Sequence, residues 1–154
     1  MRQQTRARPV AVWFLFGLML FNGIGALISG AMLFLAPDGH LLGLTEDILN
    51  RSLLSSYLAP GLILFLLIGV FPIFVCFSLL KLPGWRWPDR INPARKYHWA
   101  WSASWAVGII MLIWIITETS LLGYISALQP VIAIWGLAIF VLTMLPATRR
   151  YCTR

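Results

Sequence analysis

The residues of this 154-residue chain that could carry out chemistry are few and widely separated. The two cysteines, Cys76 and Cys152, form no C-x-x-C pair, which a thiol–disulfide relay would require. The two histidines, His40 and His98, fall near the ends of apolar segments and on opposite sides, so they are not placed to hold a haem or a zinc ion together. The sequence therefore predicts no cofactor and no metal site.

Glu118 is the acidic residue whose surroundings point most clearly to chemistry. It follows Trp114 by four residues, so the two side chains share one face of a helix. A partly buried carboxylate beside an indole could accept a proton or bind a cation. The alternative is a solvated acid beside an ordinary aromatic belt. For a ligand site we expect these lining residues: Asn22, Trp114, Glu118, Tyr124 and Gln129.

No complete catalytic set can be assembled from the other polar residues. No serine is placed with a histidine and an acid for acyl transfer, and no glycine-rich phosphate loop is present. No pair of carboxylates lies within an apolar segment, as a proton-coupled transporter would usually show. The sequence therefore predicts a protein that is not an enzyme.

Membrane-spanning helices must position these residues. Hydrophobic residues make up 60% of the chain, charged residues only 11%, and the mean hydropathy is +0.83, which excludes an ordinary soluble domain. Apolar spans are predicted at residues 9–35, 54–80, 97–117 and 130–145. We predict an all-α, four-helix transmembrane bundle that forms one domain over residues 1–154. An external loop is expected at 36–53, and a basic, tryptophan-rich cytoplasmic loop at 81–96.

Two of the predicted spans contain irregularities. Pro60 and Pro72 predict a kink in the second span. The fourth span is short, and the stretch before it, 121–128, is also apolar. Either the fourth span begins earlier and is broken near Pro130, or residues 121–128 lie at the membrane interface.

The charges predict how the chain is oriented. It has 12 Lys and Arg against five Asp and Glu, a formal net charge of +7. Only Arg51 lies on the side opposite the termini, so the other 11 basic residues share the side of both termini and the 81–96 loop. Under the positive-inside rule both termini are therefore cytoplasmic. The same distribution favours membrane lipids as partners and argues against nucleic acid.

Small residues in the first and third spans predict close helix packing. They recur four positions apart, a spacing that lets helix backbones approach one another. The pairs are Gly25 and Ser29, Ala26 and Gly30, and Ser104 and Gly108. Such pairs serve either packing within one bundle or formation of a homodimer. Asn22 also has a second interpretation, an interhelical hydrogen bond that contributes roughly 1 kcal/mol.

The cytoplasmic loop and the residues after it combine tryptophan with basic side chains. This composition is typical of an anchor at the membrane interface, and it would also suit a docking surface for a partner or a lipid headgroup. The residues expected in this anchor are Trp85, Arg86, Trp87 and Trp99.

Three segments on the predicted outer side carry motifs found together elsewhere. The motifs are Pro37-Asp38-Gly39, Leu42-Gly43-Leu44, Pro60-Gly61-Leu62 and Gly123-Tyr124-x-Ser126-x-Leu128-Gln129-Pro130. The segments FNGIGALISGAMLFLAPDGHLLGL, SYLAPGLILFLLIGVFP and WIITETSLLGYISALQP resemble an uncharacterised family of small bacterial four-helix integral membrane proteins, often described only as hypothetical or DoxX-like. Leu122 replaces the isoleucine usual in that family. The resemblance implies a fold and a compartment, the bacterial plasma membrane, and directs attention to the outer half of the bundle.

Two functions follow as hypotheses. The first is a non-enzymatic accessory or interaction protein, such as a small subunit that packs on a larger membrane complex. The second is a binder or carrier of a small hydrophobic ligand, a lipid or a quinone, in the outer half of the bundle. The expected partners are therefore membrane lipids, together with a larger membrane complex or a second copy of the chain.

Overall fold

The computed structural model describes residues 7–44 and 56–154, and the helices and turns of these two ranges include no β-strand. Along the chain the elements are α1 (Val10–Leu35), the 3-10 turn η1 (His40–Leu42), α3 (Leu58–Ile63), the π-helical η2 (Leu64–Val70), α4 (Phe71–Lys81), α5 (Arg86–Arg90), α6 (Trp99–Leu122), α7 (Leu128–Met144) and α8 (Pro146–Cys152). The predicted all-α class is confirmed for these residues. Of the loop expected at 36–53, residues 45–53 lie outside the described ranges.

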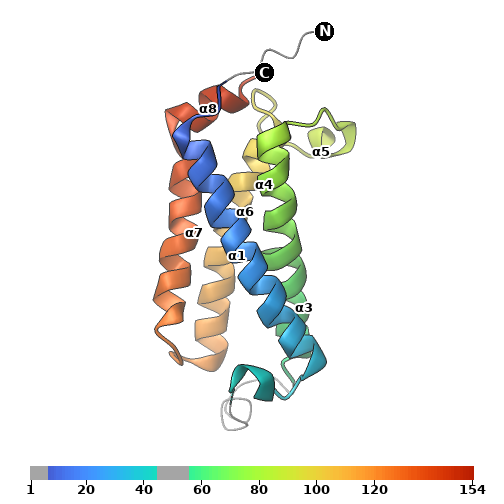
Figure 1. The fold of residues 1–154 in the computed structure, drawn as a ribbon, viewed down its shortest axis with the longest axis vertical. Helices are drawn as coiled ribbons and strands as arrows, with labels where there is room; N and C mark the ends of the chain where they lie inside the picture. Colours follow the sequence, from blue (N-terminus) through green and yellow to red (C-terminus); the bar gives the residue numbers. More distant parts are fainter. Residues whose placement is uncertain (1–6, 45–55) are drawn as a thin grey trace.

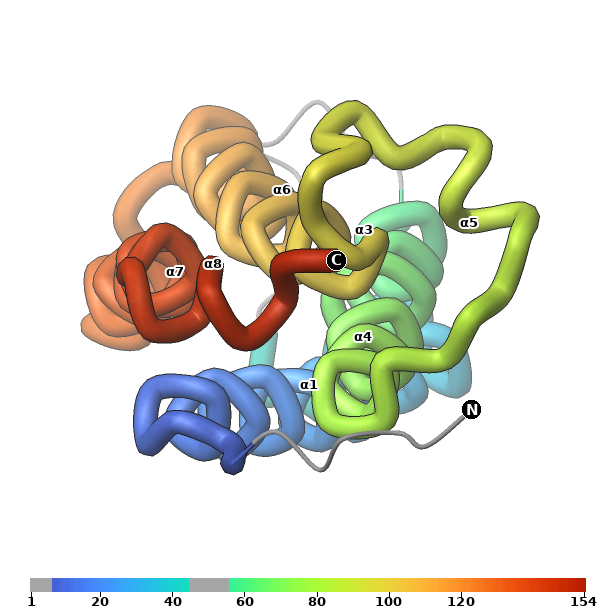
Figure 2. Tube along the Cα trace, turned by 90° about the horizontal axis from the view of Figure 1, so that it is seen from above, coloured from blue at the N-terminus to red at the C-terminus, as the bar shows by residue number. Residues whose placement is uncertain are grey.

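Four long helical segments run along the long dimension of the molecule (Figure 1). Viewed from one end they form a ring, in which α1 contacts the α3–η2–α4 segment on one side and α7 on the other, while α6 contacts α4 and α7 (Figure 2). The short helices α5 and α8 both lie at the end of the molecule that carries the start of α1 and the C-terminus (Figure 1). The two ends of the described chain therefore lie on the same side.

Three of these segments could cross a membrane by their length and apolar composition, namely α1, Leu58–Lys81 and α6. A fourth is added if α7 and α8, which are bent by 61° relative to each other, count as one broken span. The described chain is therefore compatible with a multi-pass membrane protein.

The outward faces of the long helices are apolar. Phe14, Phe21 and Ile134 are 62%, 70% and 68% exposed, whereas Met19 and Met111 in the interior are fully buried. A soluble helix would place polar residues outside, and a helix that is apolar all round needs an apolar surrounding. The exposed residues thus account for the high hydropathy of the chain.

The second long segment widens instead of breaking at its proline. Pro72 has no backbone N–H, so the carbonyl of Ile68, four residues earlier, has no α-helical donor. Residues Leu64–Val70 adopt π-helical geometry immediately before it, and the segment from Leu58 to Lys81 continues as one helix. The backbone irregularity expected from the prolines thus takes the form of a local π turn before Pro72.

The third and fourth segments join through a tight turn. α6 continues to Leu122, five residues beyond the predicted end, and α7 begins at Leu128, two residues before the predicted start. Gly123 separates them with a positive φ of 77°, a conformation that glycine adopts without strain. The apolar stretch 121–128 is therefore divided between the end of α6, this turn and the first residue of α7.

Glycines bring two pairs of helices into close contact. A Cβ on Gly30 would lie 2.7 Å from the backbone nitrogen of Phe65, and one on Gly108 would lie 2.8 Å from the carbonyl oxygen of Gly136. Gly30 and Gly108 thus serve packing within one bundle, which is the first of the two roles expected for these small residues. A Cβ on Gly25 would meet no atom within 4 Å.

Charge is divided between the two ends of the molecule. Each Lys and Arg in the described ranges lies in or beside an element at the end that carries α5 and α8. Asp38 precedes η1 at the opposite end, and Glu118 lies in the part of α6 nearest to that end.

Candidate functional site

A lateral pocket lies between the diverging halves of α1 and α7. Its volume is about 310 Å³, at the lower end of the range of about 300–1,000 Å³ that small-molecule sites occupy. The back of the pocket is formed by η2 and α6. On its outer side the pocket is lined by Phe21 on α1 and Leu128 on α7, whose side chains are 70% and 64% exposed. The pocket thus faces the apolar surroundings of the helices.

Glu118 provides the carboxylate of this pocket. It lies one helical turn after Trp114 on α6, and both residues line the cavity and are half-buried. Trp114 and Gln129 are polar neighbours of the Glu118 carboxylate. The predicted pairing of Glu118 with Trp114 is therefore present, with Gln129 of α7 as a third member.

Asn22 lines the pocket from α1 and contacts the π-helical turn behind it. Its Nδ2 donates a hydrogen bond to the carbonyl oxygen of Ile68 at 3.3 Å. In a regular α-helix this carbonyl would lack a donor, because Pro72 lies four residues later. The amide of Asn22 therefore acts both as an interhelical contact and as part of the pocket wall, which combines the two interpretations drawn from the sequence.

The small residues of α1 are divided between packing and the pocket. Gly25, Ala26 and Ser29 all line the cavity, whereas Gly30 faces the backbone of α3 and η2. A larger side chain at Gly25 or Ser29 would therefore occupy space on the pocket side. Ser104, the partner of Gly108 in the predicted pair, is fully buried and donates its hydroxyl to the Ala100 carbonyl at 2.7 Å.

The two remaining predicted ligand residues lie outside the pocket wall. Tyr124 is 70% exposed and does not line the cavity. Gln129 is buried and holds the turn between α6 and α7: its Nε2 donates to the Gly123 carbonyl at 3.0 Å, and its Oε1 accepts from the Ile125 amide at 3.1 Å. Gln129 therefore supports the pocket from behind, next to Glu118.

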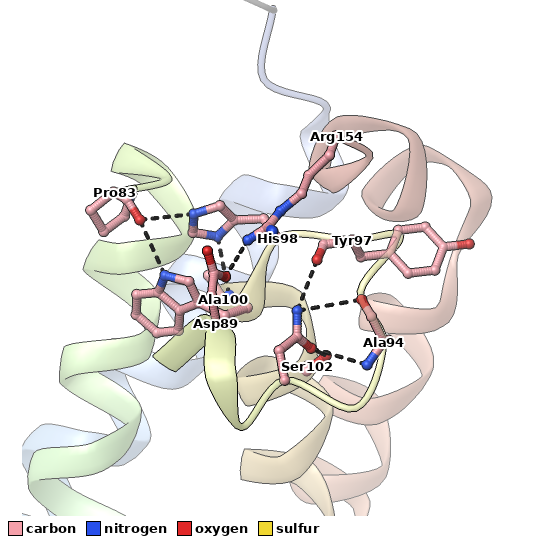
Figure 3. A network of polar contacts seen from close by, with 10 residues as sticks. Pro83, Asp89, Ala94, Tyr97, His98, Ala100, Ser102 and Arg154 are labelled. Carbon is pink, nitrogen blue, oxygen red and sulfur yellow. Dashed lines mark hydrogen bonds and ion pairs between the residues drawn. The ribbon is translucent and has the colours of Figure 1, made fainter. Parts of the chain in front are cut away.

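The opposite end of the molecule is closed by an ordered cap formed by the loop before α6 and the C-terminus (Figure 3). Asn92, which is 6% exposed, donates to the carbonyls of Ala94 and Tyr97, while its Oδ1 accepts from the Ala94 amide and the Ser102 hydroxyl. Arg154 forms an ion pair with Asp89, and the amide of His98 donates to the Cys152 carbonyl at 2.8 Å. The loop before α6 is thus held by a hydrogen bond to α6 and by contacts with the C-terminal residues.

His98 holds one tautomer within this cap. The amide of Ala100 donates to His98 Nδ1 at 3.1 Å, which caps the N-terminus of α6, and His98 Nε2 lies 2.9 Å from the Pro83 carbonyl (Figure 3). Nδ1 must therefore be the acceptor and Nε2 the donor. Burial lowers the pKa of His98 below its ordinary value of 6.5, although the hydrogen bond to Pro83 and the charge of Asp89 act in the opposite direction. The neutral ring is therefore the form that fits this cap.

The predicted anchor residues of this end fall into two groups. Trp85 and Trp87 are 45% and 64% exposed, and Arg86 is also exposed, so these three side chains reach the surface. Trp99 is only 4% exposed, donates to the Pro83 carbonyl at 3.1 Å and stacks on Trp85 at 5.9 Å. Trp99 therefore belongs to the interior of the cap.

Neither the cysteines nor the acidic residues form a metal site in the described ranges. No group of three or more His, Cys, Asp or Glu comes together within residues 7–44 and 56–154. Cys76 and Cys152 are both buried and unbonded to each other.

Two residues of the pocket region were not predicted from the sequence. Trp135 lines the pocket from α7 and donates its indole N–H to the Leu18 carbonyl at 3.1 Å. An indole in the middle of an apolar span needs such a partner, which is a signal that could have been used. Ile68 could also have been found, because it lies four residues before a proline inside a span.

Comparison of the chain with protein-family models, with curated proteins and with solved structures gave no match. The resemblance to the DoxX-like family therefore stays a prediction, and the function has to be argued from the pocket itself.

Proposed function

We propose that this chain is a non-enzymatic, multi-pass protein of the bacterial plasma membrane that binds a small amphipathic ligand. The observation that carries the proposal is the lateral pocket of about 310 Å³, where the Glu118 carboxylate lies among largely apolar walls. An apolar cavity with a few convergent polar groups is the usual form of a small-molecule site. Ionisable residues inside membrane spans are costly and mark functional sites.

The proposed arrangement has four membrane spans and both termini in the cytoplasm. It is supported by the described Lys and Arg residues, which gather at the end that carries α5 and α8. The pocket then belongs to the outer half of the bundle, and its ligand would enter from the lipid. This placement is also where the resemblance to the DoxX-like family directs attention.

Cysteine labelling in intact cells tests the orientation. Asp38 and Arg86 are both exposed, at opposite ends of the molecule. A membrane-impermeant maleimide should label Asp38→Cys in intact cells and Arg86→Cys only after the cells are opened. The unsubstituted chain, whose Cys76 and Cys152 are buried, provides the background. The reverse labelling pattern would contradict the proposed orientation.

Native mass spectrometry of the full chain in a mild detergent tests ligand binding. We expect the particle to carry a stoichiometric small molecule that is lost in Ser29→Leu, because Ser29 lines the pocket and leucine would fill it. Ser120→Leu is the matched control, since Ser120 is exposed and lies outside the lining. A bound molecule that persists equally in both variants would show that the pocket is not the site.

An accessory subunit is the second candidate, favoured by a separate feature. An open groove of about 390 Å³ runs along the flank of α1 and α7, lined by Trp13, Phe14 and Gly17 among others. A Cβ on Gly17 would meet nothing within 4 Å, so the backbone of α1 is accessible there to another helix. Foreign chains in the native mass spectrum, lost in Gly17→Leu, would support this role.

A further inference from the structure

The one charged group of the pocket lining is a hydrogen-bond acceptor. The Glu118 carboxylate is an acceptor when ionised. Asn22 donates one N–H of its Nδ2 to the Ile68 carbonyl, which leaves its Oδ1 and its second N–H for a ligand. The indole N–H of Trp135 is also used, because it donates to the Leu18 carbonyl. A ligand group that pairs with the Glu118 carboxylate must therefore be a hydrogen-bond donor.

Glu118 also has no cationic partner among residues 7–44 and 56–154. The ion pairs within these ranges join His40 to Asp38 and Arg154 to Asp89. The described Lys and Arg residues lie at the other end of the molecule. An unpaired, half-buried carboxylate is costly, and a positively charged occupant reduces this cost. The same charge repels an anionic ligand.

The walls around the carboxylate suit an organic cation better than a metal ion. Trp114 and Trp135 line the pocket with Phe21, and aromatic faces attract ammonium groups. Leu128 and Val131 on α7 continue the wall as an apolar surface. A divalent metal would need several oxygen or nitrogen ligands, whereas Glu118 is the one carboxylate in this lining.

We propose that the ligand is a cationic amphiphile, in which a single ammonium group pairs with Glu118 and an apolar chain lies along α7. This inference rests on the proposed ligand-binding function and narrows it to one chemical class. The ammonium group can belong to a free long-chain amine or to the ethanolamine headgroup of a phospholipid, and the shared chemistry is the hydrogen-bonding ammonium.

The test compares three probes of equal chain length that differ only in the head. Decylamine, decanol and decanoic acid are titrated in turn into the full chain in a non-ionic detergent at about pH 7.5, where the amine is protonated. Native mass spectrometry gives the apparent affinity of each. We expect decylamine to bind at least about tenfold more tightly than decanol, and decanoic acid to bind most weakly.

Variants then assign this preference to the carboxylate. Glu118→Gln should remove the preference for decylamine over decanol, whereas Glu118→Asp, which keeps the charge, should retain part of it. Asp38→Asn is the matched control, because it removes one exposed carboxylate far from the pocket and should leave the preference unchanged. Equal binding of decylamine and decanol to the unsubstituted chain, or a preference that survives in Glu118→Gln, would overturn the cationic class.

Ser29→Leu separates this inference from the proposed function. If decylamine and decanol bind equally and Ser29→Leu blocks both, the pocket binds amphiphiles without selecting a cation, and only the present inference fails. If Ser29→Leu affects neither probe, both proposals fail.

Short-chain phosphatidylethanolamine and phosphatidylglycerol of equal chain length distinguish the two sources of the ammonium group. Selective binding of the former identifies a lipid headgroup, and binding of decylamine alone identifies a free amine.

Discussion

The side-chain amide of Asn22 donates to the carbonyl oxygen of Ile68 at 3.3 Å. The contact joins α1 to the π-helical turn at the point where Pro72 removes a backbone donor. Inside a membrane an unsatisfied carbonyl is costly, so side chains from neighbouring helices replace the missing hydrogen bond. Near Pro146 the Thr148 hydroxyl likewise donates at 2.8 Å to the carbonyl of Leu142, four residues before the proline, which also accepts from the Leu145 amide at 3.4 Å.

A double-mutant cycle tests the link between Asn22 and Pro72. Asn22→Leu should lower the free energy of unfolding by about 1 kcal/mol, because it removes the side-chain donor to the Ile68 carbonyl. In a Pro72→Ala background the backbone can supply that donor, so Asn22→Leu should cost much less there. Unfolding in mixed detergent, followed by circular dichroism, measures all four proteins. Equal effects of Asn22→Leu in the two backgrounds would refute the link.

The glycines of α1 should differ sharply in their tolerance of a methyl group. Gly30→Ala should lower the free energy of unfolding by about 1–3 kcal/mol, because its Cβ would lie 2.7 Å from the backbone of Phe65. Gly25→Ala makes the same chemical change where no atom lies within 4 Å, and it should be close to neutral. Thermal denaturation of the two variants in the same detergent provides the comparison, and equal losses would argue against the described packing of α1.

The cap should lose stability in mild acid because of His98. Burial lowers the pKa of this residue below 6.5, so the folded state binds fewer protons than the unfolded state. The neutral His98 ring therefore contributes its full stabilisation of the folded state above about pH 6.5. This contribution declines as the pH falls toward the pKa of His98 in the folded state. Arg154 and Asp89 are the charged groups that act on His98, with opposite signs.

Melting temperatures between about pH 7.5 and 5.5 measure this effect. His98→Asn should flatten the decline, because asparagine also caps a helix N-terminus but carries no titrating ring. His40→Asn, at the exposed opposite end, should leave the decline unchanged. A decline of the same size in His98→Asn would assign the pH dependence to other groups.

Asn92 should control the rigidity of the cap loop. Asn92→Ala removes the partner of two carbonyls, one amide and the Ser102 hydroxyl, so amide hydrogen exchange across residues 91–98 should become faster. Ser102→Ala removes only one of these hydrogen bonds and should have a smaller effect. Exchange that stays as slow in Asn92→Ala as in the unsubstituted chain would contradict this role.

The sequence predicted the long helices well, because apolar length is a direct signal of a span. It failed where the boundaries depend on tertiary contacts. α6 runs on to Leu122 because Gly123 and the buried Gln129 form the turn that follows, and neither interaction is visible in hydropathy. The π turn before Pro72 was not predicted, and the contact of its Ile68 carbonyl with Asn22 depends on another helix.

The candidate site was predicted only in part. Trp114 and Glu118 share a helix face by spacing alone, so the sequence was sufficient to pair them. Tyr124 was chosen by its proximity in sequence, and it is exposed because it follows the turn at Gly123. Trp135 was missed since its position beside α1 depends on how α7 packs, which no local pattern specifies.

The π turn also sets the rotational phase of the second long segment. In a regular α-helix, two residues eight positions apart point about 80° away from each other. Gly61 and Gly69 have this separation, yet a Cβ on either would lie within 3.0 Å of a side chain of α1. The wider π turn compensates for the difference and keeps both glycines in register with α1. Deleting one residue within Leu64–Val70 would leave the two glycines seven positions apart, which a regular α-helix holds within about 20° of one face. The π turn therefore accommodates one extra residue without changing the face that the second long segment presents to α1.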